Sequence, residues 1–237
     1  MRPPDCTFAN RAEWLAARGL GSSDAAAALG YSAYRSPYVV WAEQSKLLEP
    51  EELSDRWVVQ AGIALEPLVA AWYEDEAGPL SNPGDFALWV HPEYDWMTCT
   101  PDRIEGDATI VEIKTANAWT KDAWTGGPPT NYLIQVQHQM SVTGASHAKI
   151  ACLLADIKPL FAMHQARVGI EEILATARNE EYDAAVNIYE VERNERLIAA
   201  MNDSLVEFWT GVVSGKAPDA DASESTYNAL RKLYEDK

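Results

Sequence analysis

Residues 100–114 read TPDRIEGDATIVEIK, and they place two carboxylates and a lysine at a spacing that suggests both a fold and a chemistry. Nine residues separate Asp102 from Glu112, and Lys114 follows two positions later. The residues VEIKT alternate in polarity, which predicts a strand with Glu112 and Lys114 on one face. The Gly and Asp of the intervening RIEGDATI are typical of a tight turn, so a hairpin would bring Asp102 beside Glu112.

Two carboxylates on neighbouring strands suit the chemistry of a metal-dependent phosphodiesterase. Oxygen ligands of this kind hold Mg²⁺ or Mn²⁺ and leave positions open for phosphate and water. Lys114 would then orient or deprotonate the attacking water. The alternative is a surface hairpin with solvated charges, because this spacing often occurs by chance.

Composition is typical of an ordinary globular domain. The chain has 237 residues, of which 47% are hydrophobic, with nine Trp and ten Tyr, so a substantial core is expected. No apolar run of about 18 residues predicts a membrane span, and no secretory signal is visible at the N-terminus. The odd number and wide spacing of Cys6, Cys99 and Cys152 predict reduced thiols in a cytoplasm, with one ligand too few for a four-cysteine iron–sulfur cluster.

The formal net charge of −17 is unusual for a protein that handles nucleic acid. No polybasic run appears in the sequence. Any contact with DNA is therefore expected to be local, through a few cations, backbone amides and bound metal.

Apolar spacing along the chain predicts an α/β (α+β) fold, with a central mixed sheet flanked by helices. Ser23 and Ser36 are expected to cap helices, and Pro67 to kink or break one. Three strands between residues 86 and 114 are expected to form a meander. Helices are expected at 9–19, 24–30, 37–46, 52–77, 130–144, 170–180, 192–213 and 225–235. Strands are expected at 86–91, 95–101, 109–114, 148–155 and 184–191, with 160–168 as a further strand or hairpin partner.

Several polar residues outside the hairpin are candidates for the same site, each with a structural alternative. Glu66, on a long helix, is either a third metal ligand or a solvated side chain. Tyr132 and Gln135 share one helical face and either bond to a phosphate or form a polar exposed face. The four histidines are scattered singly, which argues against a zinc site.

The segment LGSSDAAAALG is a candidate phosphate-binding loop. Its backbone amides and the hydroxyls of Ser22 and Ser23 could contact a phosphate, or simply cap a helix. Arg18, just ahead of this segment, either binds a phosphate through its guanidinium or is a solvated side chain at a helix end. Trp119 and Trp124 are the better candidates for contact with a base or sugar. The core is the expected place for Trp41, Trp57, Trp72 and Trp209.

Five segments in order make the chain resemble the phage-type alkaline exonucleases, which are YqaJ-like viral recombinases related to lambda exonuclease. The resemblance covers roughly residues 11–220, and five ordered motifs are far more specific than any one of them. The segments are EWLAARGLGSSDAAAALGYSAYRSPYVVWAEQ, AGIALEPLVAAWYEDEAG, HPEYDWMTCTPDRI, VEIKT and NYLIQVQHQMSVTG.

The resemblance implies a restriction-endonuclease-like fold of the PD-(D/E)xK type and a site for two divalent ions, Mg²⁺ or Mn²⁺. Lys114 would position or activate the attacking water. By position, the metal ligands would be Asp102, Glu112, the carbonyl of Ile113, and Glu66. The other matches are Tyr132 and Gln135 in the active site, Thr100 at a phosphate, and Arg18 and Ser23, with Ser22 beside them, at a DNA 5′-phosphate.

The function implied by the resemblance is 5′→3′ digestion of linear double-stranded DNA, which leaves 3′ single strands for recombination by annealing. It also implies a homo-oligomeric ring around DNA, often of three subunits, and a single-strand-annealing protein as partner. The alternatives are a structure-specific or restriction-type endonuclease on the same fold, or a non-catalytic DNA-binding module. The expected nuclease domain is 1–214, with a candidate insertion at 156–181, followed by a linker and helix over 215–237.

Overall fold

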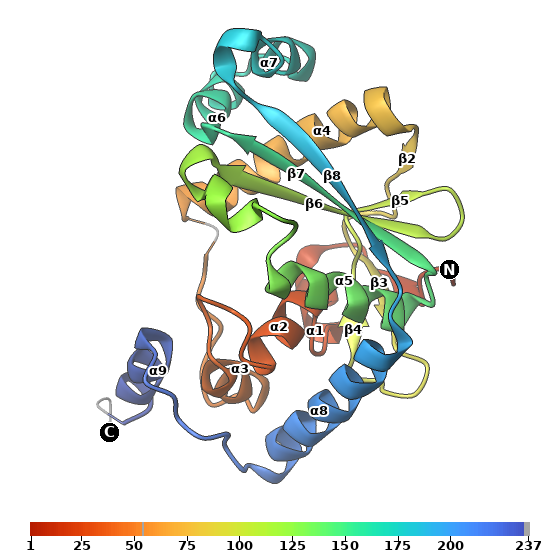
Figure 1. The fold of residues 1–237 in the computed structure, drawn as a ribbon. Helices are drawn as coiled ribbons and strands as arrows, with labels where there is room; N and C mark the ends of the chain where they lie inside the picture. Colours follow the sequence, from red (N-terminus) through yellow and green to blue (C-terminus); the bar gives the residue numbers. More distant parts are fainter. Residues whose placement is uncertain (54, 235–237) are drawn as a thin grey trace.

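The computed structural model describes residues 1–53 and 55–234 of the chain. Two 3₁₀ segments, Ala118–Trp124 and Glu180–Tyr182, interrupt the regular elements within these ranges. The strands are β1 (Cys6–Thr7), β2 (Leu80–Ser81), β3 (Ala87–Val90), β4 (Thr98–Cys99), β5 (Arg103–Glu105), β6 (Thr109–Asn117), β7 (His147–Ala155) and β8 (Ala185–Glu192) (Figure 1). The helices are α1 (Arg11–Ala17), α2 (Ser22–Ala28), α3 (Pro37–Gln44), α4 (Trp57–Ala77), α5 (Thr130–Thr143), α6 (Ile157–Gln165), α7 (Ile170–Ala177), α8 (Glu195–Ser214) and α9 (Glu224–Tyr234).

A mixed sheet with the order β2-β5-β6-β7-β8 forms the centre of the molecule. β5 and β6 form the expected antiparallel hairpin, with Arg103 opposite Val111, and Asp102 lies directly before its first strand. β6 and β7 run parallel, with Glu112 opposite Ile150, and β8 pairs antiparallel to β7. The predicted central mixed sheet is therefore confirmed.

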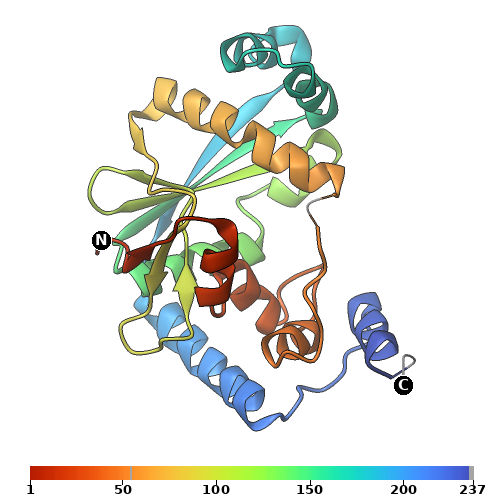
Figure 2. The same cartoon turned by 180° about the vertical axis from the view of Figure 1, so that it is seen from behind.

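Helices cover both faces of this sheet, with α4 on one side and α5 on the other (Figures 1 and 2). Successive side chains of a strand point to opposite faces. Val111 and Ile113 accordingly pack in the apolar cluster that contains α4, and Ile110 packs in the cluster that contains α5. The same alternation directs Glu112 toward α5, where Gln135 and Gln139 bond to it.

The expected meander over residues 86–114 is wrong, because its strands belong to two sheets. β3 and β4 pair with each other, with Trp89 opposite Cys99, and join β1 in a small separate sheet. The chain leaves β4 through Thr100, Pro101 and Asp102 before β5 begins. Proline has no amide hydrogen for a ladder, so Pro101 marks the point where the chain passes from one sheet to the other.

The segment 160–168, which was expected to be a strand, lies mostly in helix α6. Asp156 caps this helix by accepting a hydrogen bond from the amide of Lys158 at 3.3 Å. Ile157, Leu160 and Phe161 are its buried residues, and their i, i+3, i+4 spacing is helical. α6 and α7 both pack on α4, so the candidate insertion at 156–181 extends the layer on that face of the sheet.

Three smaller differences concern helix ends and a proline. α4 continues through Pro67 as a single helix, so the break at that residue is absent. The N-cap of α2 is Gly21 rather than Ser23, and the amide of Gly21 donates to Asp24. Ser36 does cap α3, as expected. The expected helix at 52–77 begins at Trp57, and residue 54 lies outside the described residues.

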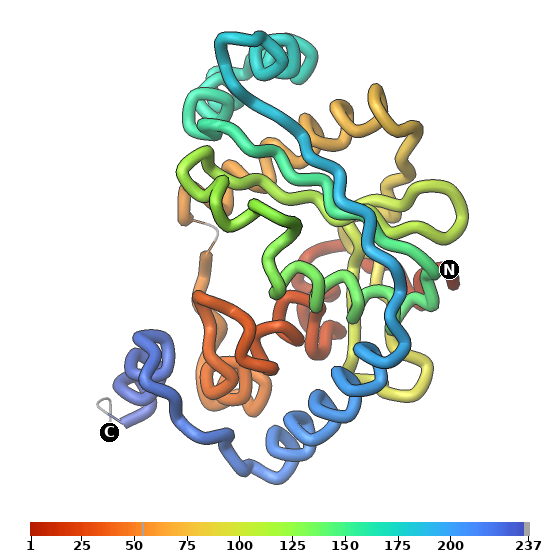
Figure 3. The backbone as a smooth tube through the Cα atoms, viewed as in Figure 1, coloured from red at the N-terminus to blue at the C-terminus, as the bar shows by residue number. Residues whose placement is uncertain are grey.

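The last helix, α9, packs beside α3, as the chain path in Figure 3 shows. Thr226 donates a hydrogen bond to Ser36 at 2.6 Å, which ties the start of α9 to the cap of α3. The domain boundary at residue 214 stays a prediction, and residues 235–237 of the expected C-terminal segment lie outside the described residues. Of the expected core tryptophans, Trp41 and Trp72 are buried, Trp209 is half-buried, and Trp57 is 40% exposed.

Candidate active site

The predicted site residues gather at a cavity of about 240 Å³ between α1, α2, β4, β6 and α5. The other predicted residues, Glu66, Ile113, Lys114 and Tyr132, are not among its lining residues, although Lys114 contacts Glu112, which is. The lining residues that were not predicted are Trp14, Gly21, Asp85, Cys99 and Gln139. The predicted residues that line it are Arg18, Ser22, Ser23, Thr100, Asp102, Glu112 and Gln135.

Glu112 is the most thoroughly bonded side chain of the site. It is buried, and its Oε1 accepts hydrogen bonds from Lys114 and from Gln135, the latter at 2.5 Å. Its Oε2 accepts from Gln139 at 2.7 Å. Gln139 is one helical turn beyond Gln135, so an i, i+4 reading of QVQHQ would have placed both on the face toward Glu112.

Asp102 lies where a negative charge is costly. Its Oδ2 accepts a hydrogen bond from the amide of Ile113 at 2.8 Å, which closes the base of the hairpin. Burial, together with the nearby charge of Glu112, raises the pKa of Asp102 well above its usual value, and Lys114 opposes this only in part. The pair of carboxylates therefore favours the presence of further positive charge.

Lys114 is held in its protonated form. Burial alone would lower the pKa of Lys114, but the carboxylates of Glu112 and Asp102 outweigh it and raise the pKa above the usual value. Its ammonium also lies over the ring of Tyr132, 5.0 Å from the ring centroid. In this arrangement Lys114 is a hydrogen-bond donor to Glu112, and its role toward an attacking water stays a prediction.

Glu66 is not brought to Asp102 and Glu112 by direct contact. Its Oε1 pairs with Nη1 of Arg103 at 2.6 Å. Among the described residues, no three His, Cys, Asp or Glu side chains converge closely enough to hold a metal ion. Asp102 and Glu112 still fit a hard divalent cation, because both line the same cavity and carboxylate oxygens are the ligands that such a cation prefers.

Arg18 and its surroundings form the opposite wall of the cavity. The guanidinium lies over the ring of Trp14 at 5.0 Å and pairs with Asp24 at 3.4 Å. Arg35, which was not predicted, pairs with Asp24 from the other side and also with Glu43. Burial would raise the pKa of Asp24, but the two arginines hold it below its usual value.

Ser22 and Thr100 are already engaged by protein groups. Ser22 shares a hydrogen bond of 3.0 Å with Nδ1 of the buried His138, and Ser23 is exposed. Thr100 accepts from Nε1 of Trp14 at 3.2 Å and donates to the carbonyl of Ala87 at 2.6 Å. Burial lowers the pKa of His138 to about 3, so its ring is neutral.

The two loop tryptophans have different environments. Trp124 is buried and stacks on Tyr132 and Tyr189, with ring centroids 5.4 and 5.7 Å apart, so the expectation that it contacts a base or sugar is wrong. It packs because the 3₁₀ segment returns its ring to α5 and β8. Trp119 is 73% exposed, so contact with DNA stays a prediction for this residue.

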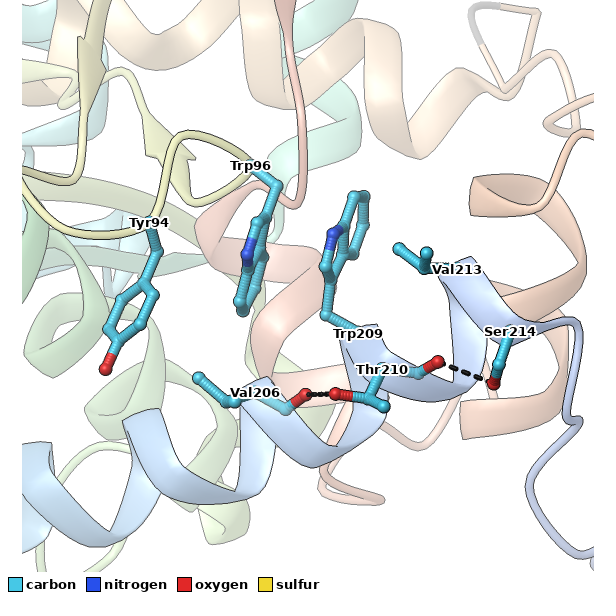
Figure 4. A pocket seen from close by; sticks show the side chains of 7 residues that line it. All are labelled: Tyr94, Trp96, Val206, Trp209, Thr210, Val213 and Ser214. Carbon is cyan, nitrogen blue, oxygen red and sulfur yellow. Dashed lines mark hydrogen bonds between the residues drawn. The ribbon is translucent and has the colours of Figure 1, made fainter.

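A second cavity, of about 290 Å³, lies between the β3–β4 loop and α8 (Figure 4). Trp96 and Trp209 stack there with centroids 4.8 Å apart. The hydroxyls of Thr210 and Ser214 bond back to carbonyls of their own helix. None of the described residues that line it is a carboxylate, lysine or arginine, so it lacks the groups for phosphodiester chemistry.

The fold is that of known exonucleases. The crystal structure of an alkaline exonuclease (LHK-Exo) from Laribacter hongkongensis has a TM-score of 0.64 and 24% identity, and covers 96% of this chain and 100% of its own. A phage related exonuclease from Haemophilus somnus 129PT has a TM-score of 0.56 and 14% identity, and covers 84% of this chain and 96% of its own. At these identities the likeness concerns the fold.

The chain belongs to the family of the YqaJ-like viral recombinase domain, whose model matches residues 13–146. The uncharacterized protein YqaJ of Bacillus subtilis (strain 168) is 29% identical over 232 residues, which are 95% of this chain. The chain spans 64% of the length of that relative. The predicted family is confirmed. In the part of the chain that the structure describes, no helix is long and apolar enough to cross a membrane.

Proposed function

We propose that this chain is a divalent-metal-dependent deoxyribonuclease that degrades linear double-stranded DNA from a 5′ end. One observation carries the proposal: Asp102 and Glu112 line a cavity that Arg18 also lines, and Lys114 contacts Glu112 directly. Membership of the YqaJ-like family and the fold shared with an alkaline exonuclease support the same reaction.

Asp102 and Glu112 are the residues that would hold a divalent cation such as Mg²⁺ or Mn²⁺. When bound, such an ion supplies positive charge that neutralises the scissile phosphate and the leaving oxygen. Carboxylate oxygens are the ligands that these cations prefer. Glu66 and the carbonyl of Ile113, as further ligands for a second ion, are supported only by the family resemblance.

The other side chains bind and orient. Gln135 and Gln139 hold the carboxylate of Glu112 from the helix side. Lys114, whose ammonium lies over the ring of Tyr132, would position or activate the attacking water. Arg18, with Ser22, Ser23 and Thr100 nearby, provides the positive side of the cavity for a terminal phosphate.

The family resemblance also supports a biological context for the reaction. We propose that digestion leaves 3′ single strands for recombination by annealing, beside a single-strand-annealing protein. We also propose a homo-oligomeric ring around DNA. A chain with a net charge of −17 repels DNA over most of its surface, so a ring would limit contact with DNA to cations placed inside it.

The test compares three substrates in Mg²⁺ and in EDTA: a linear duplex with 5′-phosphates, the same duplex with 5′-hydroxyls, and a closed circle. The expected result is Mg²⁺-dependent loss of the linear duplexes from their 5′ ends, with the phosphorylated ends preferred and the circle left intact. Cleavage of the circle would instead indicate an endonuclease on this fold. Binding without degradation would indicate a non-catalytic module.

Gly21→Ala tests whether Arg18 recognises the 5′-phosphate. A Cβ at residue 21 would lie 2.1 Å from Nη2 of Arg18, so the guanidinium, which lies over Trp14, has to shift. Loss of a charged hydrogen bond costs about 1.5–3 kcal/mol, or roughly ten- to hundredfold in affinity. We expect a loss of this size on 5′-phosphorylated ends, and little change on 5′-hydroxyl ends.

The matched control is Gly169→Ala, because a Cβ at Gly169 meets nothing within 4 Å. Initial rates on both kinds of end, measured for the two variants and the wild type, give the comparison. An unchanged preference for phosphorylated ends in Gly21→Ala would remove Arg18 from the proposed phosphate site.

A further inference from the structure

In the side-chain amide of Gln139, the nitrogen has a hydrogen-bond partner and the oxygen has none among the described residues. Its Nε2 donates to Oε2 of Glu112 at 2.7 Å. Its Oε1 is buried and has no hydrogen-bond partner among the described residues. The whole side chain is 1% exposed, yet it lines the cavity that contains Asp102 and Glu112.

The orientation of this amide follows from the charge beside it. Only the NH₂ end can donate to the carboxylate of Glu112, and the reversed amide would set two acceptors against each other. Oε1 is therefore the atom of this amide that has no hydrogen-bond partner among the described residues. A buried acceptor without a donor costs free energy, and an apolar side chain at this position would avoid that cost.

The groups around the cavity indicate which kind of ligand Oε1 of Gln139 would bind. Asp102 and Glu112 are acceptors once ionised, and the protein donors Lys114 and Gln135 are already directed at Glu112. Gln139 lines the same cavity as the two carboxylates, and an unsatisfied amide oxygen there matches the preference of a divalent cation for oxygen, or of the water molecules that such a cation retains.

We infer that Gln139 is a positioning residue of the cation site, with Nε2 fixing Glu112 and Oε1 accepting a hydrogen bond from a water molecule that the cation retains. This inference rests on the proposed function, because it requires a divalent cation at Asp102 and Glu112. It adds a residue that the motif of Asp102, Glu112 and Lys114 does not contain. Side chains that support metal ligands in this way typically change metal affinity about 10- to 100-fold.

The test measures binding of the metal alone, without DNA. The full chain, stripped with a chelator, is titrated calorimetrically with MgCl₂ and with MnCl₂, as wild type and as Gln139→Met. We expect the variant to raise Kd for both ions by about tenfold or more. In EDTA the variant loses the donor to Glu112 as well as the unpaired buried oxygen, and because these changes oppose each other its unfolding temperature should stay close to that of the wild type.

Gln137→Met is the matched control on the same helix. Gln137 is also buried, but its amide donates to the carbonyl of Glu192 and accepts from the amide of Asn194, away from the cavity. This control should lose stability and keep the Kd of the wild type. If Gln139→Met does not fold, Gln139→Ala, which leaves room for water, takes its place with the same expected loss of affinity.

The outcomes separate this inference from the proposed function. Wild-type binding of Mg²⁺ with an unchanged Kd in the folded Gln139 variant overturns the role of Gln139 and leaves the nuclease proposal intact. Absence of Mg²⁺ binding and of Mg²⁺-dependent degradation in the wild type overturns both. An equal loss of affinity in Gln137→Met would show that the effect comes from α5 in general, and would also overturn the inference.

Discussion

Asp102→Asn should abolish Mg²⁺-dependent degradation of linear DNA and, in the absence of metal, stabilise the fold. The activity falls because one of the two buried carboxylates for the cation is gone, and we expect a loss on the order of 10³-fold. The stability rises because the ionised Asp102 is buried beside Glu112, which raises its pKa well above the usual value. Asparagine keeps an oxygen for the amide of Ile113 and removes the charge.

The gain in stability has a defined dependence on pH. A carboxyl whose pKa is raised in the folded state binds more protons there than in the unfolded state, so stability is lost as pH rises above the unfolded value of 3.8. Asp102→Asn should therefore unfold at a higher temperature than the wild type in EDTA at neutral pH. This difference should shrink as the pH approaches 4. Thermal unfolding across this range is the measurement.

Asp203→Asn on the exposed side of α8 is the matched control, and neither its activity nor its stability should change. Saturating Mg²⁺ should reverse the order of stability, because only the wild type retains both carboxylates for the ion. If Asp102→Asn kept Mg²⁺-dependent activity, Asp102 would not be part of the cation site. If Asp102→Asn were less stable than the wild type in EDTA at neutral pH, the charge of Asp102 in the wild type would be compensated by its surroundings.

The hairpin with Asp102, Glu112 and Lys114 was predictable because its signals are local. Period-two alternation and a turn over a few residues decide which side chains share a face, and the structure pairs the strands as expected. The predicted meander was wrong because the pairing of strands depends on contacts between residues that are distant in the sequence. A single proline between Cys99 and Asp102 moves the chain from the small sheet to the central one.

The residues that sequence reasoning missed are those whose partners lie on distant elements. Arg35 meets Asp24 and Glu43 only because α2 and α3 pack together. Gln139 reaches Glu112 only because β6 directs that carboxylate toward α5. For Trp124 the sequence suggested an exposed loop residue, but its ring stacks on Tyr132 and is buried. Helical spacing was sufficient to suggest Gln139, but without the sheet facing it the partner could not be identified.

Lys114→Met should also abolish the reaction, but with the opposite effect on stability. Loss of a dedicated proton donor or positioned charge lowers rates about 10²–10⁴-fold. The side chain of Glu112 is 3% exposed, and that of Lys114 is 20% exposed, so the methionine leaves a buried carboxylate without its cation. Breaking such a pair costs about 3–5 kcal/mol, and we expect the lower end because Gln135 and Gln139 still donate to Glu112.

A second substitution identifies the cause of that loss. In a chain of this size each kcal/mol lowers Tm by roughly 2–4 °C, so Lys114→Met in EDTA should unfold measurably earlier than the exposed control Lys121→Met. Adding Glu112→Gln to Lys114→Met should recover most of the difference, because the uncompensated charge is then removed. Mg²⁺ should stabilise Lys114→Met by more than it stabilises the wild type, since the ion replaces the missing positive charge. If Lys114→Met degraded DNA at the control's rate, Lys114 would be only a structural partner of Glu112. If the double variant were as unstable as the single one, packing and not charge would explain the loss.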